Sequence, residues 1–305
     1  AKLPVSRRAR VAEAARLAKR AEKLRKVGEE EKNRELLERA QALDSDNAEA
    51  AWWLGDYWHG AGDTKTALKQ FRRYLRIHNG DPEALHMIAA LGGRPKPRRA
   101  SDGYVRDHFD AFAEHFDESL VQDLKYQAPK LLYKAVRKVR GRGRGLMDML
   151  DLGVGTGLAG MQFQSIVNKV WGVDLSTEMA KRARARGIYE TVAVSEITAY
   201  MRKTQRQFDL VTAADVLIYF GDLSGVFKGV DRVLRADGLF ALSSEMHTGE
   251  DFRLTNSGRY SHSLKYLRRL AKDVGMVPAH LDRGRLRYEL GKPVNGHVVV
   301  FAKKA

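Results

Sequence analysis

Hydrophobic side chains in the first part of the chain recur every three or four residues. Leu17, Ala21 and Leu24 show this spacing, and residues 36–43 repeat it. Such spacing places apolar side chains on one face of an α-helix, whereas a half-buried strand would alternate apolar and polar residues. No strand-like alternation occurs between residues 8 and 91. The pattern therefore predicts an all-helical N-terminal region.

The same region repeats itself at a fixed interval. Shifting the chain by 34 residues places Leu37 on Phe71 and Asn47 on Asp81, so that apolar and turn positions both coincide. Paired helices with a 34-residue period resemble the tetratricopeptide repeat. About two and a half copies fit into residues 1–91, close to the minimum that can bury a shared face. The resemblance implies a small all-α repeat domain, which would offer a surface to a peptide or protein partner.

The composition changes after residue 91. Residues 92–101, GGRPKPRRAS, contain two glycines, two prolines and four basic residues, and they predict a linker. Residues 102–145 are predicted to be helical and are rich in aromatic side chains. In residues 146–305, short buried strands such as MDMLDL, KVWGVD and FDLVTAA alternate with helical stretches. This alternation predicts an α/β domain with parallel strands and helices on both faces of the sheet.

The end of the chain has a different pattern. LRYEL and HVVVFAK, separated by the turn GKPVNG, predict an antiparallel pair at an edge of the sheet. The RYSHS stretch at residues 259–263 is expected to lie in a loop.

A glycine-rich turn follows the first strand of the α/β domain, in DLGVGTGLAG at residues 151–160. Glycine allows a ligand to approach the backbone closely. In one interpretation, Gly155, Gly157 and Gly160 form a dinucleotide-binding G-x-G-x-x-G motif, with Asp174 about 20 residues later as the ribose-binding acid.

In the second interpretation, the string resembles motif I of the class I S-adenosylmethionine-dependent methyltransferases, formed here by Asp151, Gly153, Gly155 and Gly157. A carboxylate at this loop would repel a pyrophosphate, but it would attract the ammonium group of S-adenosylmethionine, directly or through water. We therefore favour the methyltransferase, which implies a Rossmann-like sheet and S-adenosylmethionine as the cofactor, with S-adenosylhomocysteine as the product.

The resemblance extends over nearly the whole chain, to predicted bacterial methyltransferases with N-terminal tetratricopeptide repeats. One position departs from the pattern, because Val154 stands where such loops often carry cysteine. The resemblance implies that Asp174 binds the ribose and Glu196 the adenine amino group, although Glu196 would serve equally well as an acid at the start of a helix. The remaining cofactor contacts that it implies are Leu175, Met179 and Ile197 near the adenine, Asp215 near the methyl group, and Phe116 and Tyr126 around the sulfonium. The resemblance also implies that the helical segment 102–145 covers the cofactor site.

Polar residues late in the chain are candidates for the acceptor side. His262 is a candidate general base because imidazole titrates near neutral pH, and Asp215 and Tyr219 complete the expected catalytic set. Arg259 and Arg287 have the geometry to clamp an anionic acceptor, or they pair with Glu245 or Glu289 instead. Glu245 and Tyr260 complete the expected acceptor-binding set.

Composition narrows the chemistry further. The chain has no cysteine, which excludes disulfides, thiolate zinc sites, iron–sulfur clusters and cysteine nucleophiles. A formal net charge of +16 favours anionic partners. The basic runs lack interleaved aromatic residues, which argues against a nucleic-acid partner and ranks RNA methylation low.

We expect no metal site, no membrane span and a cytoplasmic location. The main alternative to an enzyme is a non-catalytic repeat scaffold that retains the methyltransferase fold.

Overall fold

The computed structural model describes residues 6–93, 96–118, 124–141, 145–249, 251–289 and 291–304. The chain forms two compact units. One contains Ala1–Lys96 with Asn256–Gly258, and the other contains Pro97–Thr255 with Arg259–Ala305. Each unit has its own hydrophobic core.

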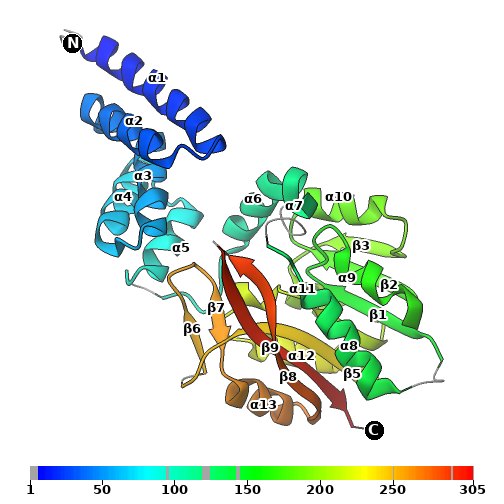
Figure 1. Ribbon diagram of the computed structural model, residues 1–305. Coiled ribbons are helices and arrows are strands. Elements are labelled where there is room, and N and C mark those ends of the chain that lie inside the picture. Colours follow the sequence, from blue (N-terminus) through cyan, green and yellow to red (C-terminus); the bar gives the residue numbers. More distant parts are fainter. Residues whose placement is uncertain are drawn as a thin grey trace. The chain divides into compact units, whose positions relative to one another are not determined.

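Five helices lie in the described part of the N-terminal unit. They are α1 (Arg7–Lys26), α2 (Glu30–Leu43), α3 (Ala48–Gly60), α4 (Thr64–Ile77) and α5 (Pro82–Ala90) (Figure 1). The starts of α2 and α4 differ by 64 − 30 = 34 residues, and those of α3 and α5 by 82 − 48 = 34. The N-caps of α3 and α5, Asn47 and Asp81, also lie 34 apart, and each accepts a backbone N–H with its side chain. The expected 34-residue helical period is therefore present.

Close packing within this unit depends on one glycine. A Cβ atom at Gly55 would lie 2.7 Å from the ring of Phe71, so α3 and α4 approach as they do only because this side chain is absent. Ala67 and Phe71 on α4 are buried in the same contact.

The C-terminal unit begins with helices and continues as an α/β sheet. Its first helices are α6 (Asp102–Phe112), the short η1 (Ala113–His115) and α7 (Phe116–Glu118), and α8 (Ala128–Arg140), which has Pro129 in its first turn. The strands are β1 (Met147–Leu152), β2 (Val167–Asp174), β3 (Thr191–Val194), β4 (Phe208–Ala213), β5 (Leu234–Met246), β6 (Phe252–Leu254), β7 (Tyr260–His262), β8 (Met276–Glu289) and β9 (Lys292–Lys303).

The sheet has the order β3-β2-β1-β4-β5-β7-β6, with parallel pairing from β3 through β5 to β7. β9 pairs antiparallel with β5, and β8 pairs antiparallel with β9. The other helices of the unit are α9 (Leu158–Phe163), η3 (Gln164–Ile166), α10 (Thr177–Ala185), α11 (Ile197–Lys203), η4 (Leu217–Tyr219), α12 (Ser224–Val233) and α13 (Leu264–Asp273). The parallel sheet and the final antiparallel pair confirm the α/β fold predicted from the sequence.

Helices cover both faces of the sheet. α8 packs across one face through Leu132 and Val136, together with Phe163 of α9 (Figure 1). α11, α12 and α13 pack on the other face, in the largest hydrophobic cluster of the chain. The carboxyl ends of β1–β4 are left for a ligand, as in other open α/β sheets.

Two segments differ from the sequence-based prediction. The RYSHS stretch, expected as a loop, contains β7, which pairs with both β5 and β6. The last part of the expected linker belongs to the C-terminal unit, since Ala100 N–H donates to the Tyr219 carbonyl (2.8 Å) and Gly221 N–H to the Arg98 carbonyl (2.8 Å). Ala100 is also buried in the core.

Candidate functional site

A cavity lies at the carboxyl ends of β1, β2, β3 and β4. Each of these strands contributes residues at or just beyond its end: Gly153–Thr156 after β1, Asp174 and Leu175 at the end of β2, Glu196 and Ile197 after β3, and Ala214–Val216 after β4. Helix α6 and the segment before α8 supply the opposite wall. The cavity therefore brings together four segments that lie between residues 153 and 216 of the sequence.

The turn after β1 needs glycine for two different reasons. Gly153 and Gly155 have φ angles of +64° and +53°, in the left-handed region that residues with a side chain rarely adopt. A Cβ atom at Gly153 would also lie 2.4 Å from Val216, whereas one at Gly155 would face the ring of Phe116 at 3.4 Å. The backbone of this turn is thus exposed to the cavity, with Phe116 opposite.

Asp174, the last residue of β2, fixes the shape of the turn. Its carboxylate accepts hydrogen bonds from Gly155 N–H (2.8 Å) and Ser176 N–H (2.9 Å), and burial raises its pKa. Leu175 and Met179 line the same part of the cavity. The structure therefore brings together three of the residues expected around an adenosine.

Asp151 is buried behind the lining of the cavity. It is 1% exposed and is not among the cavity residues. Its carboxylate accepts hydrogen bonds from the Thr212 hydroxyl (2.8 Å) and the Tyr189 hydroxyl (2.9 Å), and burial raises its pKa to about 6. Both carboxylate oxygens of Asp151 are thus held by hydroxyl groups of the protein.

Tyr189 was not singled out by sequence analysis. A Cβ atom at Gly160 would lie 2.4 Å from its hydroxyl oxygen, so Gly160 makes room for this ring. The third glycine of the apparent dinucleotide motif therefore serves packing.

Glu196 lies at the start of a helix and also at the cavity. It is the N-cap of α11, and its carboxylate accepts from Thr198 N–H (3.0 Å) and Ala199 N–H (2.8 Å). The side chain also lines the cavity beside Ile197.

Helices α6 and α7 are attached to the rim of the cavity by two aspartates. Asp110 accepts hydrogen bonds from the Ser176 hydroxyl (2.5 Å) and Glu178 N–H (3.2 Å), at the start of α10. Asp117 accepts from the Thr156 hydroxyl and from Arg186. The glycine turn is thereby tied to the aromatic wall.

That wall consists of a chain of rings. Phe109 lies between Phe116 and Tyr219, with ring centroids 6.0 and 5.5 Å apart. Phe112 also lines the cavity. Tyr126 lines it too and donates its hydroxyl to the Ala214 carbonyl (3.3 Å), and burial raises the pKa of this hydroxyl.

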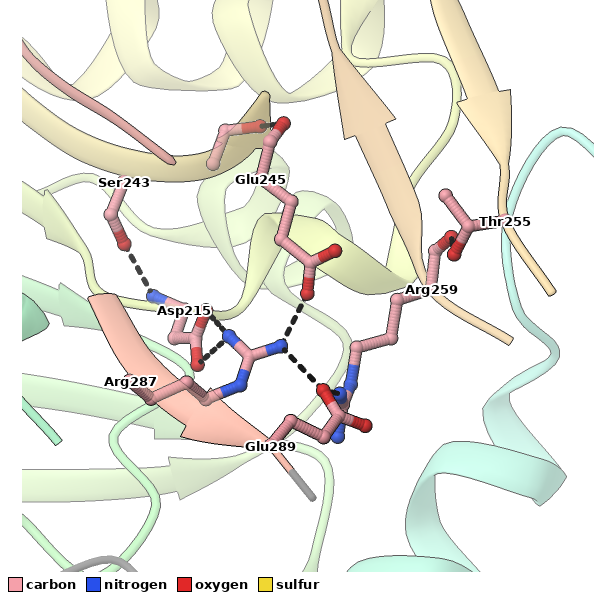
Figure 2. A network of polar contacts seen from close by, with 8 residues as sticks. Asp215, Ser243, Glu245, Thr255, Arg259, Arg287 and Glu289 are labelled. Atoms are coloured by element: carbon pink, nitrogen blue, oxygen red, sulfur yellow. Dashed lines mark hydrogen bonds and ion pairs between the residues drawn. The ribbon is translucent and has the colours of Figure 1, made fainter. Parts of the chain in front are cut away.

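Beyond β4, a buried ionic network forms the far wall (Figure 2). Both oxygens of Asp215 accept hydrogen bonds from Nη1 of Arg287, each at 2.8 Å. Nη2 of Arg287 binds Glu245 and lies 3.6 Å from Glu289, which in turn binds Arg259. Asp215 has a φ angle of +60°, and its N–H donates to the Ser243 hydroxyl (2.9 Å).

Both arginines are therefore engaged by carboxylates. The side chain of Arg287 is 2% exposed, and burial raises the pKa of Glu245. With every group ionised, three carboxylates face two guanidinium groups, so the formal charge is 2 − 3 = −1. Arg259 and Arg287 are thus paired with carboxylates of the protein, and they are not free to clamp an anionic acceptor.

His262 does not reach the cavity. It is fully buried in β7, where Nδ1 lies 2.6 Å from the Ser244 hydroxyl and Nε2 lies 2.8 Å from the Phe220 carbonyl oxygen. Burial lowers its pKa to about 4. With both ring nitrogens held by protein groups, the ring is in no position to act as a base on a substrate in the cavity.

Two further residues differ from the expected acceptor-binding set, one because it does not line the cavity and one because it does. Tyr260 is also outside the cavity lining and donates its hydroxyl to the Pro97 carbonyl (2.7 Å). His108 on α6, which sequence analysis did not select, lines the cavity. Its position between aromatic residues in a helix gave no local signal of a site.

In the parts of the chain that the structure describes, no three histidine or acidic side chains gather in a way that could hold a metal ion. Likewise, no described helix is long and apolar enough to cross a membrane.

Comparisons with known proteins support the assignment of the fold. Residues 150–242 match the family model described as a methyltransferase domain. A protein of Methanocaldococcus jannaschii, described as uncharacterized, is 31% identical over 134 residues, which cover 43% of this chain and 57% of that protein. The ubiquinone biosynthesis O-methyltransferase of Xanthomonas oryzae is 27% identical over 114 residues, or 36% of this chain and 48% of that enzyme. The chain spans about half the length of these curated relatives.

Among solved structures, the 1,6-didemethyltoxoflavin-N1-methyltransferase of Burkholderia thailandensis, with bound 1,6-didemethyltoxoflavin and S-adenosylhomocysteine, has a similar fold. It is 17% identical with a TM-score of 0.52, and the likeness covers 66% of this chain and 87% of that one. Residues 150–242 are thus similar to methyltransferase domains, and the sheet order of the C-terminal unit agrees with the fold of the solved methyltransferase structure.

Proposed function

We propose that the cavity binds S-adenosylmethionine and that the chain transfers its methyl group to a small-molecule acceptor. The observation that carries this proposal is the order of the cavity residues. Glycine turn, Asp174, Glu196 and Asp215 follow four parallel strands whose carboxyl ends meet in one cavity.

The strand order suggests how the cofactor would lie. Along β3-β2-β1-β4, Glu196 and Ile197 would meet the adenine, Asp174 the ribose, and the glycine turn the methionine part. The transfer end would then lie beside Asp215, at the end of β4. Phe116 and Tyr126 are placed to surround the sulfonium, since aromatic faces attract cations.

The chemistry that the bound group supplies is a methyl carbon activated by a positive sulfur. The task of the protein is then to hold an acceptor atom in line with that carbon and to exclude water. The aromatic wall of α6, closed over the turn by Asp110 and Asp117, serves both purposes. The intact glycine turn favours this function over a scaffold without activity.

The direct test is calorimetric titration of the full chain with S-adenosylhomocysteine. We expect Asp174→Ala to weaken binding by roughly tenfold or more, because two ribose hydroxyls would lose a charged, buried acceptor. Glu190→Gln, an exposed carboxylate paired with Lys169, is the matched control and should bind like the wild type. Equal affinity of Asp174→Ala and wild type would contradict the ribose assignment, and binding of NAD in place of S-adenosylhomocysteine would contradict the function.

We also propose that the N-terminal unit is a tetratricopeptide-type repeat. The 34-residue offset of its helices, the equivalent caps at Asn47 and Asp81, and the Gly55–Phe71 contact support this. Such a unit would serve to bind a peptide or protein partner.

A further inference from the structure

The walls of the cavity are acidic although the whole chain is strongly basic. Three basic side chains line it, Arg99, Arg259 and Arg287, against four acidic ones, Asp102, Asp174, Glu196 and Asp215, which gives a formal charge of 3 − 4 = −1. Two more carboxylates, Glu245 and Glu289, lie behind the lining and bind its arginines. The chain as a whole has a formal charge of +16.

The negative charge is concentrated where methyl transfer would occur. Asp215 follows β4, next to the glycine turn, and its network partners come from β5, β8 and the start of β7 (Figure 2). Arg287 cannot turn away to meet a ligand anion, because three carboxylates surround it and its side chain is almost completely buried. Charges in such a poorly hydrated setting act strongly on a ligand beside them.

From this charge distribution we propose that the acceptor is an uncharged amine. The inference rests on the proposed function. An amine nitrogen would form a bond to the methyl carbon with its lone pair, while the carbon–sulfur bond breaks and its electron pair stays on sulfur. The products are S-adenosylhomocysteine and an N-methylammonium ion, which keeps its proton until it leaves.

The reason lies in the charge balance of that step. The reacting groups carry one positive charge before transfer, on sulfur, and one positive charge after it, on nitrogen. The network of charge −1 matches both states. A carboxylate or phenolate acceptor would instead bring a second negative charge against Asp215, and after transfer the network would face a neutral pair.

The rest of the acceptor wall is apolar. Val105, Phe109, Phe112, Ile218 and Phe220 line the cavity on the side of α6 and η4. The amine is therefore carried on an apolar, ring-containing frame, which stacks on these aromatic side chains.

Sinefungin provides a test that does not require the acceptor, since it carries an ammonium group where S-adenosylmethionine carries its methyl-bearing sulfonium. We expect calorimetry to give a dissociation constant for sinefungin at least tenfold lower than that for S-adenosylhomocysteine. The ratio of interest is the dissociation constant of S-adenosylhomocysteine divided by that of sinefungin. Asp215→Asn and Glu289→Gln each remove one negative charge from the network, and each should reduce this ratio severalfold. Glu289 is partly exposed, so its variant should fold even if Asp215→Asn does not. Glu190→Gln should keep the ratio of the wild type.

A ratio of one or less in the wild type would overturn the proposal, while intact S-adenosylhomocysteine binding would leave the proposed function standing. Failure to bind either compound would instead contradict the proposed function. A second measurement follows isotope-labelled methyl groups into small molecules of a cell extract. Label on nitrogen supports the amine, and label on oxygen, sulfur or carbon overturns it.

Discussion

Asp151 carries a carboxylate at a position that is almost completely buried, and its pKa of about 6 expresses the cost of ionising it there. The folded chain therefore holds a proton on Asp151 more tightly than the unfolded chain, whose aspartate pKa lies near 3.8. The contribution of this group to stability is fully present below about pH 4 and is lost as the pH rises through about 6. At neutral pH the ionised carboxylate destabilises the fold relative to a neutral side chain.

Replacing this carboxylate with a neutral amide should remove the pH dependence. Asp151→Asn can still accept a hydrogen bond from one hydroxyl and donate one to the other, because Tyr189 and Thr212 can rotate their O–H groups. We expect the free energy of unfolding of the variant, measured relative to that of the wild type, to rise by about 2–3 kcal/mol as the pH increases from 4.5 to 8. The measurement is the calorimetric unfolding transition of the C-terminal unit at several pH values, with the exposed Asp273→Asn as control. A difference that does not change with pH would contradict the burial argument.

At the residue scale, sequence analysis identified the site residues that lie close together in the sequence. The glycine turn and Asp174 form a short linear motif, and both lie at the cavity. The partners of Asp215 could not be found in this way, because Arg287 is 72 residues away and reaches it only through the pairing of β8, β9 and β5. The same holds for His262, whose burial depends on strand β7.

Among the elements, α6 and α7 form a cover that is held at only a few polar points. Asp117 binds the Thr156 hydroxyl and Arg186, and Asp110 caps the start of α10. These contacts join the aromatic wall to the turn that would hold the methionine part of the cofactor. Loss of either should let the cover separate from the turn more often.

We expect Asp117→Ala to raise the dissociation constant of S-adenosylhomocysteine about three- to tenfold, as the loss of one charged hydrogen-bonded contact implies. The increase should appear mainly in the dissociation rate, because the cover slows release. Stopped-flow displacement measures that rate, and Asp107→Ala, an exposed change on α6, is the control. An unchanged dissociation rate would mean that the contact plays no part in retention.

At this scale the sequence predicted the long elements better than the short ones. Strands β1, β2 and β4 have six to eight residues each, most of them buried and many of them apolar, so their pattern is long enough to recognise. Strands β6 and β7 have three residues each and exist because β5 extends beyond β4 and offers them an edge. A pattern of three residues is too short to predict such strand pairing.

At the scale of the whole molecule, the boundary between the two units decides which fragment can function. Residues 97–101 belong to the C-terminal unit through the Arg98 and Ala100 backbone contacts with residues 219–222. Residues 219–222 come shortly after Asp215 in the sequence, and Tyr219 belongs to the aromatic wall. A fragment that begins after this segment would leave backbone groups without partners.

We therefore expect residues 97–305 to bind S-adenosylhomocysteine with the affinity of the full chain, since every cavity residue lies within them. A fragment of residues 102–305 should bind at least severalfold more weakly or melt at a lower temperature. Calorimetric titration and thermal melting of both fragments test this. Loss of binding in the longer fragment would show that the repeats complete the site.

The acidic cavity inside a basic molecule has a consequence for how fast a cationic ligand is captured. S-adenosylmethionine carries one net positive charge, so a chain of charge +16 repels it at distances of tens of ångströms, and salt at physiological strength screens that repulsion within about 8 Å. The attraction of the buried carboxylates begins only near the opening and is hardly screened. Added salt should therefore speed the arrival of S-adenosylmethionine while leaving its departure nearly unchanged, the reverse of ordinary electrostatic steering. S-adenosylhomocysteine lacks the sulfonium, so its arrival should depend little on ionic strength.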